Sequence, residues 1–87
     1  MLIEKKLTIK NEQGLHARPA AIFVQIANKY ESDIVVKKGS QEVNGKSIMG
    51  LLTLAAEKGA RLHIKVNGPD AKEAISELEK VILGDTP

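Results

Sequence analysis

The sequence predicts an α+β fold in which one antiparallel sheet of four strands carries three helices on a single face. Three observations favour it. Several short segments alternate apolar and polar side chains, so one face of each strand is in water and the other in the core. Other segments carry apolar residues at helical spacing. The 87 residues make one domain, 1–87, and the element order is β-α-β-β-α-β-α.

The first third of the chain predicts a strand, a loop and a helix. Residues 2–9 alternate loosely between apolar and polar side chains, which is typical of a half-buried strand. Lys5 falls on the apolar face, which indicates a frayed strand end or a position near a sheet edge. A loop over 11–15 follows. We expect a helix over 17–29 because the segment is long, rich in alanine and marked by Pro19 at its start.

The middle of the chain predicts a hairpin followed by a short helix. Residues 33–38 and 41–43 are rich in β-forming side chains, and the glycine and serine between them favour a tight turn. Ser47 stands directly before the apolar run 48–52, as a capping serine does at a helix start.

The last third predicts a strand and a helix. Residues 61–66 alternate, and one face is fully polar. Asp70 is predicted to cap the final helix, with Glu73 completing a capping box. Apolar residues at helical spacing over 71–82 form one stripe, and Gly84 ends it.

Composition excludes several classes of function. The chain has no cysteine, so it has neither a disulfide framework nor a thiolate metal site. Phe23 and Tyr30 are its only aromatic residues, which argues against a surface that stacks single-stranded nucleic acid. Residues 1–4 lack the form of a signal peptide, and no apolar run approaches the length of a membrane span. We expect a cytoplasmic protein that is not inserted in a membrane.

One of the two histidines lies in the run Gly14-Leu15-His16-Ala17-Arg18-Pro19-Ala20. Gly14 allows a sharp turn, and Pro19 suits a first helical turn, where N–H groups lack partners. The backbone N–H groups of Ala17 and Arg18, with the helix dipole, would seat an anion. The Arg18 guanidinium could fork onto phosphate oxygens. The pattern predicts that His16 accepts and releases a phosphoryl group; a capping or surface role is the structural alternative.

Ser47 also has two interpretations. It caps the short helix, which needs no further function. It is also a hydroxyl at a helix start, where the helix dipole would tolerate an added phosphate. The run that follows is too apolar for a short helix to bury entirely. Such a run belongs to the core more often than to an interface, and here both interpretations can hold. We expect Leu51 and Leu54 to face inward and Ile48, Met49 and Leu52 to face outward.

The second histidine, His63, alternates with the apolar positions of its strand, so we expect it on the wet face. Neither glycine, proline nor arginine surrounds it in the pattern seen at His16. Nothing in the sequence brings the two histidines together, so we expect no metal site and no cofactor.

The motif from Gly14 to Ala20, together with Lys46-Ser47-Ile48-Met49-Gly50, resembles the HPr family, the histidine-containing phosphocarriers of the bacterial sugar phosphotransferase system. The resemblance covers essentially the whole chain in length and element order. It implies an open-faced β-sandwich with three helices on one side. It implies that His16 takes phosphate at Nδ1 from phosphorylated enzyme I and passes it to the IIA domains of sugar permeases.

The resemblance also assigns roles to the neighbouring residues. Arg18 and the backbone amides of Ala17 and Arg18 would steady the phosphate. Ser47 would be the target of HPr kinase/phosphorylase, with a transcriptional regulator as a further partner. The apolar part of the docking surface would be Ile48, Met49 and Leu52. A carrier with two sequential partners on one surface is expected to be a monomer.

Alternatives remain open at this level. Gln13 stands where many members carry a small hydroxyl residue, so a further hydrogen bond to the phosphate from that side is in doubt. A regulatory relative lacks the active histidine, which this chain keeps. A nitrogen-related branch shares the histidine motif. A small nucleic-acid-binding domain is suggested only by the basic pI of about 9.0, and we expect no nucleic-acid partner.

Overall fold

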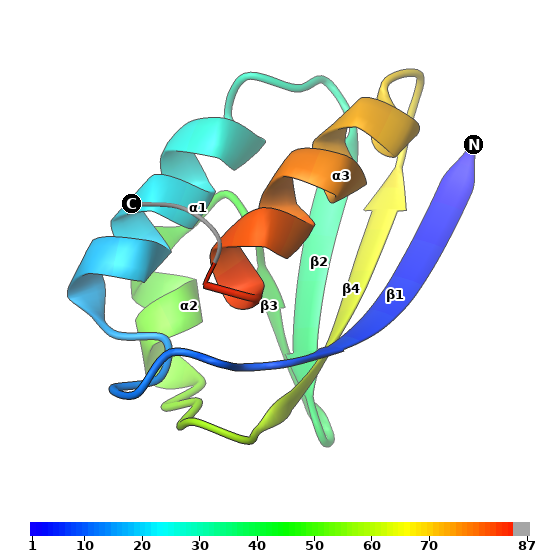
Figure 1. Ribbon diagram of the computed structural model, residues 1–87. Helices are drawn as coiled ribbons and strands as arrows, with labels where there is room; N and C mark the ends of the chain where they lie inside the picture. The colour runs from blue at the N-terminus through cyan, green and yellow to red at the C-terminus, as the bar shows by residue number, and fades with distance from the viewer. Residues whose placement is uncertain (85–87) are drawn as a thin grey trace.

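The computed structural model describes residues 1–84, and it confirms the predicted α+β architecture. Four strands form one sheet in the order β1-β4-β2-β3, and every neighbouring pair is antiparallel. The bounds of the strands are β1 Leu2–Thr8, β2 Asp33–Lys38, β3 Gln41–Asn44 and β4 Arg61–Asn67. Three helices pack on one face of this sheet (Figure 1): α1 Ala17–Ala27, α2 Ile48–Thr53 and α3 Ala71–Ile82.

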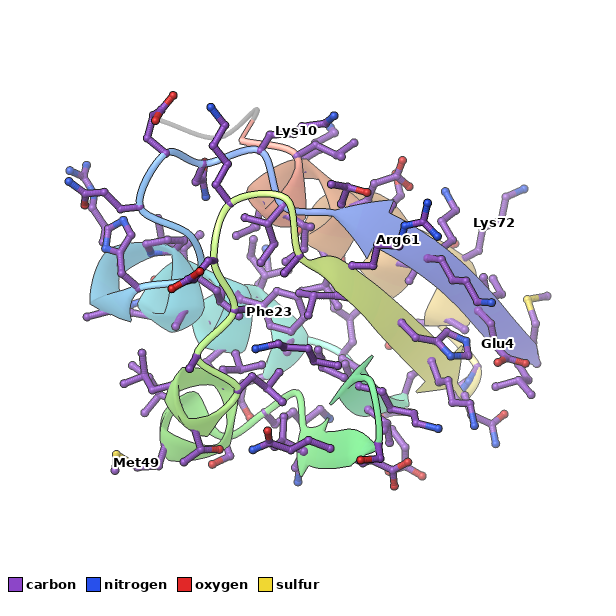
Figure 2. The ribbon with its side chains drawn as sticks, turned by 90° about the horizontal axis from the view of Figure 1, so that it is seen from below. Glu4, Lys10, Phe23, Met49, Arg61 and Lys72 are labelled. Atoms are coloured by element: carbon purple, nitrogen blue, oxygen red, sulfur yellow. The ribbon has the colours of Figure 1, made fainter. Side chains whose placement is uncertain are left out.

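The core lies between the sheet and the helices. Apolar and polar side chains alternate along β4. The apolar ones face inward, and each is almost fully buried. Phe23 of α1, which is completely buried, lies in the interior of the view in Figure 2. The apolar stripe of α3 is buried as its spacing predicts; its members are Ala71, Ala74, Ile75, Leu78, Val81 and Ile82. The apolar side chains whose spacing predicted the helices are therefore the ones that pack them against the sheet.

Strand β1 lies at an edge of the sheet, as the position of Lys5 indicated. The Lys5 ammonium forms an ion pair with Glu79 of α3 on the helix side. An edge position lets a long cationic side chain reach solvent beside the core, because its charged group can stay in water.

The first helix is shorter than predicted: it ends at Ala27 and not at Lys29. The Asn28 side chain donates to the carbonyl of Val24 at 2.9 Å. The backbone N–H groups of Lys29 and Tyr30 bond three residues back, which tightens the last turn and ends the helix.

Asp70 occupies the N-cap position of α3, as predicted, but its side chain makes no capping hydrogen bond, so the predicted capping box with Glu73 is wrong. The backbone angles of Asp70 are φ −113° and ψ 27°, whereas a capping side chain normally sits on extended backbone. The carboxylate accepts hydrogen bonds from the backbone N–H of Glu31 at 2.9 Å and of Ser32 at 3.1 Å, and from the Ser32 hydroxyl at 2.5 Å. Asp70 therefore ties the start of α3 to the loop that leads into β2.

Within residues 1–84, no helix is long and apolar enough to cross a membrane.

Candidate functional site

His16 is the residue that precedes the first turn of α1. Its backbone is extended, with φ −86° and ψ −173°, and its carbonyl accepts from the N–H of Ala20 at 3.0 Å. Its side chain makes no capping hydrogen bond and is half-buried. The backbone at His16 is thus fixed by the helix start, while its imidazole makes no capping hydrogen bond to that helix.

The loop before His16 is fixed by contact with the segment that follows α2. Gly14 has φ +73°, and a Cβ there would overlap the carbonyl oxygen of Ala56 and lie 2.8 Å from Cα of Glu57. The N–H of Leu15 donates to the same Ala56 carbonyl at 2.8 Å, and the Leu15 side chain is buried. Glycine is needed here both for the left-handed backbone and for the close approach.

The start of α1 has the backbone features on which the predicted anion seat depends. The first N–H groups of an α-helix have no partner within the helix, and here they belong to Ala17 and Arg18, which are both exposed. Pro19 has no N–H group, and its ring is buried. The helix carries no acidic residue in its first turn, so the partial positive charge of this end is not neutralised from within.

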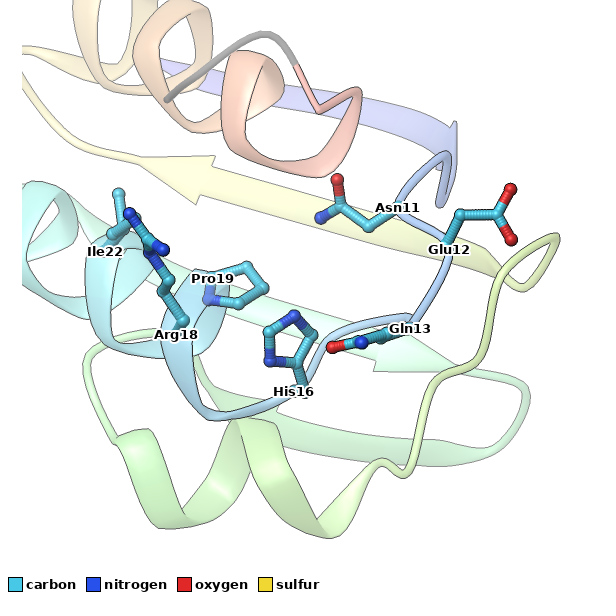
Figure 3. A pocket seen from close by; sticks show the side chains of 7 residues that line it. All are labelled: Asn11, Glu12, Gln13, His16, Arg18, Pro19 and Ile22. Carbon is cyan, nitrogen blue, oxygen red and sulfur yellow. The ribbon is translucent and has the colours of Figure 1, made fainter.

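His16 lies in an open hollow of about 320 Å³. The residues that line it are Asn11, Glu12, Gln13, His16, Arg18, Pro19 and Ile22 (Figure 3). The Arg18 side chain is directed toward Ile22 and not onto the His16 ring in this view. His16 and Arg18 therefore line the same hollow, but the guanidinium must turn to reach a group on the ring.

The loop residues Asn11 and Glu12 and the helix residue Ile22 are members of the hollow that sequence reasoning missed. The Glu12 carboxylate pairs with the ammonium of Lys58 at 2.7 Å. The position of Glu12 depends on how its loop packs against the segment of Lys58, and no local sequence pattern reports that packing. The only sequence signal for these loop residues is that 11–13 directly precede the histidine motif.

Ser47 caps α2 as predicted: its hydroxyl oxygen accepts from the N–H of Gly50 at 3.0 Å. Lys46, directly before it, donates from its ammonium to the carbonyl of Tyr30 at 2.7 Å, beyond the end of α1. Lys46 therefore links the start of α2 to the end of α1.

The apolar run of α2 divides between core and surface. Leu51 and Leu54 are buried, as predicted. Ile48 and Met49 are 37% and 68% exposed, while Leu52 is half-buried and packs partly against the core. We call Ile48, Met49 and Leu52 the apolar patch.

Helix α2 connects the two predicted sites. Ser47 lies at its start, and the segment after its end contacts Gly14. This end is held by side chains of the hairpin: Lys38 donates to the carbonyls of Leu54 at 2.9 Å and Ala55 at 3.3 Å. Ala55 has a left-handed backbone, with φ +50°. A helix of six residues spans roughly 9 Å, so all three residues of the apolar patch lie within about that distance of Ser47 along the helix axis.

His63 lies elsewhere, as predicted. It is on β4, its Nε2 is 2.8 Å from a carboxylate oxygen of Glu4, and it does not line the hollow of His16. Within residues 1–84, no group of three or more histidine or acidic side chains is placed to hold a metal ion.

Comparison with known proteins decides the family. The family model described as "PTS HPr component phosphorylation site" matches residues 3–83. The chain belongs to the HPr family. Among HPr-family relatives, the HPr-like protein Crh of Halalkalibacterium halodurans is 44% identical over 77 residues, which are 88% of this chain and 92% of Crh.

Solved HPr structures share the fold. The crystal structure of the phosphocarrier protein HPr from Bacillus anthracis str. Ames has a TM-score of 0.89 and 41% identity, and the match covers 93% of this chain and 96% of that one. The crystal structure of an HPr dimer from Thermoanaerobacter tengcongensis has a TM-score of 0.73 and 47% identity, with 87% of each chain covered. Family membership makes this chain a component of a phosphotransferase system.

Proposed function

We propose that His16 carries a phosphoryl group from phosphorylated enzyme I to the IIA domains of sugar permeases. The lone pair of its Nδ1 attacks the phosphorus held on the histidine of enzyme I, and the old P–N bond breaks as the new one forms. The departing imidazole of enzyme I takes back its electron pair. The second transfer repeats the displacement with His16 as the donor.

The observation that carries this proposal is the position of the His16 ring. It is free of hydrogen bonds within the described chain, and it stands at a helix start whose first N–H groups are unpaired. Such a site orients and neutralises a phosphoryl group, which is the main task of a protein in phosphoryl transfer. A helix end contributes about 0.3–1 kcal/mol at an exposed site, which orients the group without trapping it.

Arg18 is proposed to steady the phosphoryl group together with the backbone amides of Ala17 and Arg18. A guanidinium directed toward Ile22 reaches the ring only after rotation of its side chain. The rest position leaves the approach to His16 open, and the turned position adds charge once the phosphoryl group has arrived.

Ser47 is proposed as a regulatory phosphorylation site for HPr kinase/phosphorylase. A phosphate there would add roughly −1.5 to −2 charges beside the apolar patch. That patch is the proposed docking surface for enzyme I and the IIA domains. The added charge would hinder partners with acidic rims and favour others, such as a transcriptional regulator, with basic ones.

A second candidate is a mainly regulatory role, favoured by the 44% identity to an HPr-like protein named Crh. The presence of His16 in an open site favours the carrier over a regulatory relative that lacks the histidine. A carrier of the nitrogen-related branch would use the same site with other partners. The carrier proposal places the protein in the cytoplasm, together with enzyme I. We propose that it is a monomer, because a monomer leaves its one docking surface free. The alternative assembly is a dimer like that of the Thermoanaerobacter relative.

The test is transfer of labelled phosphate from phosphoenolpyruvate through enzyme I. We expect acid-labile label on the wild-type protein and on His63→Ala, and none on His16→Ala. Label that persists in His16→Ala, or no label on the wild type, would refute the carrier role. A wild type that takes up label only on Ser47 from ATP and a kinase would favour the regulatory candidate.

A further inference from the structure

The outer face of the sheet carries a second hollow, on the far side from the helices. Its volume is about 300 Å³. The residues that line it are Lys6, Lys37, Gly39, Arg61, Leu62 and His63. In Figure 2, Arg61 and Glu4 lie along the strands at one end of the view, and Met49 of α2 lies at the other. A ligand in this hollow would therefore leave the apolar patch uncovered.

Strand pairing brings the basic side chains of this hollow together. In the antiparallel register, His63 of the central strand β4 lies opposite Lys6 of β1 on one side and opposite Lys37 of β2 on the other. Arg61 precedes His63 by two residues, so both point to the same face. Three permanent cations from three strands thus surround one imidazole.

These three cations have no acidic partner in the described chain. Within residues 1–84, no ion pair joins Lys6, Lys37 or Arg61 to a carboxylate. The acidic residues of this face, Glu4, Asp33 and Glu42, do not line the hollow itself. Glu4 pairs with His63, and Glu42 lies opposite Lys37 in the β3 register without reaching ion-pair distance.

We propose that this hollow binds a compact anion that carries several phosphate groups. Unpaired like charges on neighbouring strands repel one another, so an anion between them relieves that repulsion. The row from β1 to β2 crosses two strand spacings, roughly 10 Å, which fits a short chain of phosphates better than a single one. A volume of this size is at the lower end for a small-molecule site.

An acidic polypeptide fits less well. Its extended surface would meet the carboxylates of Glu4 and Glu42 outside the hollow, whereas a compact anion lies between the cations. The proposal is independent of phosphoryl transfer, because it uses no residue of the His16 site.

The test titrates ¹⁵N-labelled protein with tripolyphosphate and follows each backbone amide and the His63 ring. We expect saturable shifts at 6, 37, 61 and 63. The double variant Lys6→Gln/Lys37→Gln should weaken the Kd by at least about tenfold, because two charge-assisted contacts are lost. The matched control is Lys65→Gln, on the same strand face but outside the hollow, and it should change the Kd less than about twofold.

Two further arms separate the ligand classes. Orthophosphate should bind at least about tenfold more weakly than tripolyphosphate, because it spans fewer cations. Poly-glutamate should leave the hollow unshifted. The proposal is overturned if shifts are confined to residues 16–18 at the start of α1, if the double variant binds as tightly as Lys65→Gln, or if poly-glutamate competes equally with tripolyphosphate.

Discussion

The backbone of Gly14 lies directly against the carbonyl of Ala56, with no room for a side chain between them. This contact joins the loop before His16 to the segment after α2, and the hydrogen bond from Leu15 to the same carbonyl reinforces it. The His16 site is therefore held partly by residues forty positions along the chain from it.

Gly14→Ala should destabilise the fold by about 2 kcal/mol or more, because left-handed strain and steric overlap add. Urea unfolding measures it. Gly39→Ala is the matched control: its φ is also positive, +61°, but nothing lies within 4 Å of the added Cβ. The control should cost only about 1 kcal/mol of strain. Equal losses in the two variants would show that the Ala56 contact contributes nothing.

Ala55→Gly should stabilise the protein by about 0.5–1 kcal/mol. Ala55 follows Leu54, the C-cap residue of α2, and has φ +50°, a conformation in which glycine carries no steric penalty. Thermal unfolding of the two proteins side by side gives the result. Ala60→Gly, outside the left-handed region, should destabilise or be neutral. A lower melting temperature for Ala55→Gly would contradict the conformational argument.

Asp70 should stabilise the fold in a pH-dependent way. The hydrogen bond from the Ser32 hydroxyl, followed by that from the Glu31 N–H, lowers the pKa of Asp70 below its ordinary value. A lowered pKa means that the stabilisation is present above the ordinary carboxyl pKa and is lost as pH falls through the lower, folded value. The unfolding free energy of Asp70→Asn should be below that of the wild type at pH 7.

The difference between Asp70→Asn and the wild type should shrink as the pH falls below about 4. Asp33→Asn, an exposed carboxylate on β2, serves as the control and should differ little from wild type at pH 7. If the difference in unfolding free energy between Asp70→Asn and the wild type does not change with pH, the charge of Asp70 does not contribute to stability.

Much of the fold could be predicted because its signals are local. The alternation of β4 and the stripe of α3 each report which face is buried, and both were confirmed. The partner of Asp70 could not be predicted, because Ser32 lies thirty-eight positions away. A carboxylate at a helix start can accept hydrogen bonds either from its own helix or from a segment distant in the sequence. The backbone angles at Asp70 decide which of these two sets of donors it meets.

The candidate site divides in the same way. His16, Arg18 and Pro19 follow from one helix start, which the sequence marks. Glu12 and its partner Lys58 come together only because the loops of residues 11–15 and 55–60 pack against each other. Local patterns do not report such packing, since either loop could satisfy its polar groups with water.

Ser47→Asp should slow the phosphorylation of His16 by enzyme I, because it adds negative charge beside the apolar patch. Asparagine and aspartate cap helices about equally well, so Ser47→Asn keeps the cap without the charge. Steady-state transfer assays with both variants separate the two effects. We expect Ser47→Asn to behave like the wild type. Equal rates for all three proteins would count against regulation at this position.

Arg18→Gln should slow transfer through His16 by about tenfold, because a charge-assisted contact to an exposed phosphoryl group is lost. Lys72→Gln, an exposed cation of α3, should leave the rate unchanged and controls for net charge. Rapid-quench measurement of label transfer gives both rates. If the two variants transfer equally fast, Arg18 acts only through the overall charge of the protein.

The central claim is that Nδ1 of His16 holds the phosphoryl group at the start of α1. Long-range ¹H–¹⁵N spectra of the ¹⁵N-labelled protein, recorded with enzyme I and phosphoenolpyruvate, test it most directly. The predicted result is a phosphorus-coupled Nδ1 signal from His16, with the amides of Ala17 and Arg18 shifted and the His63 ring unchanged. Phosphorylation at Nε2, phosphorylation of His63, or an unmodified His16 would contradict it.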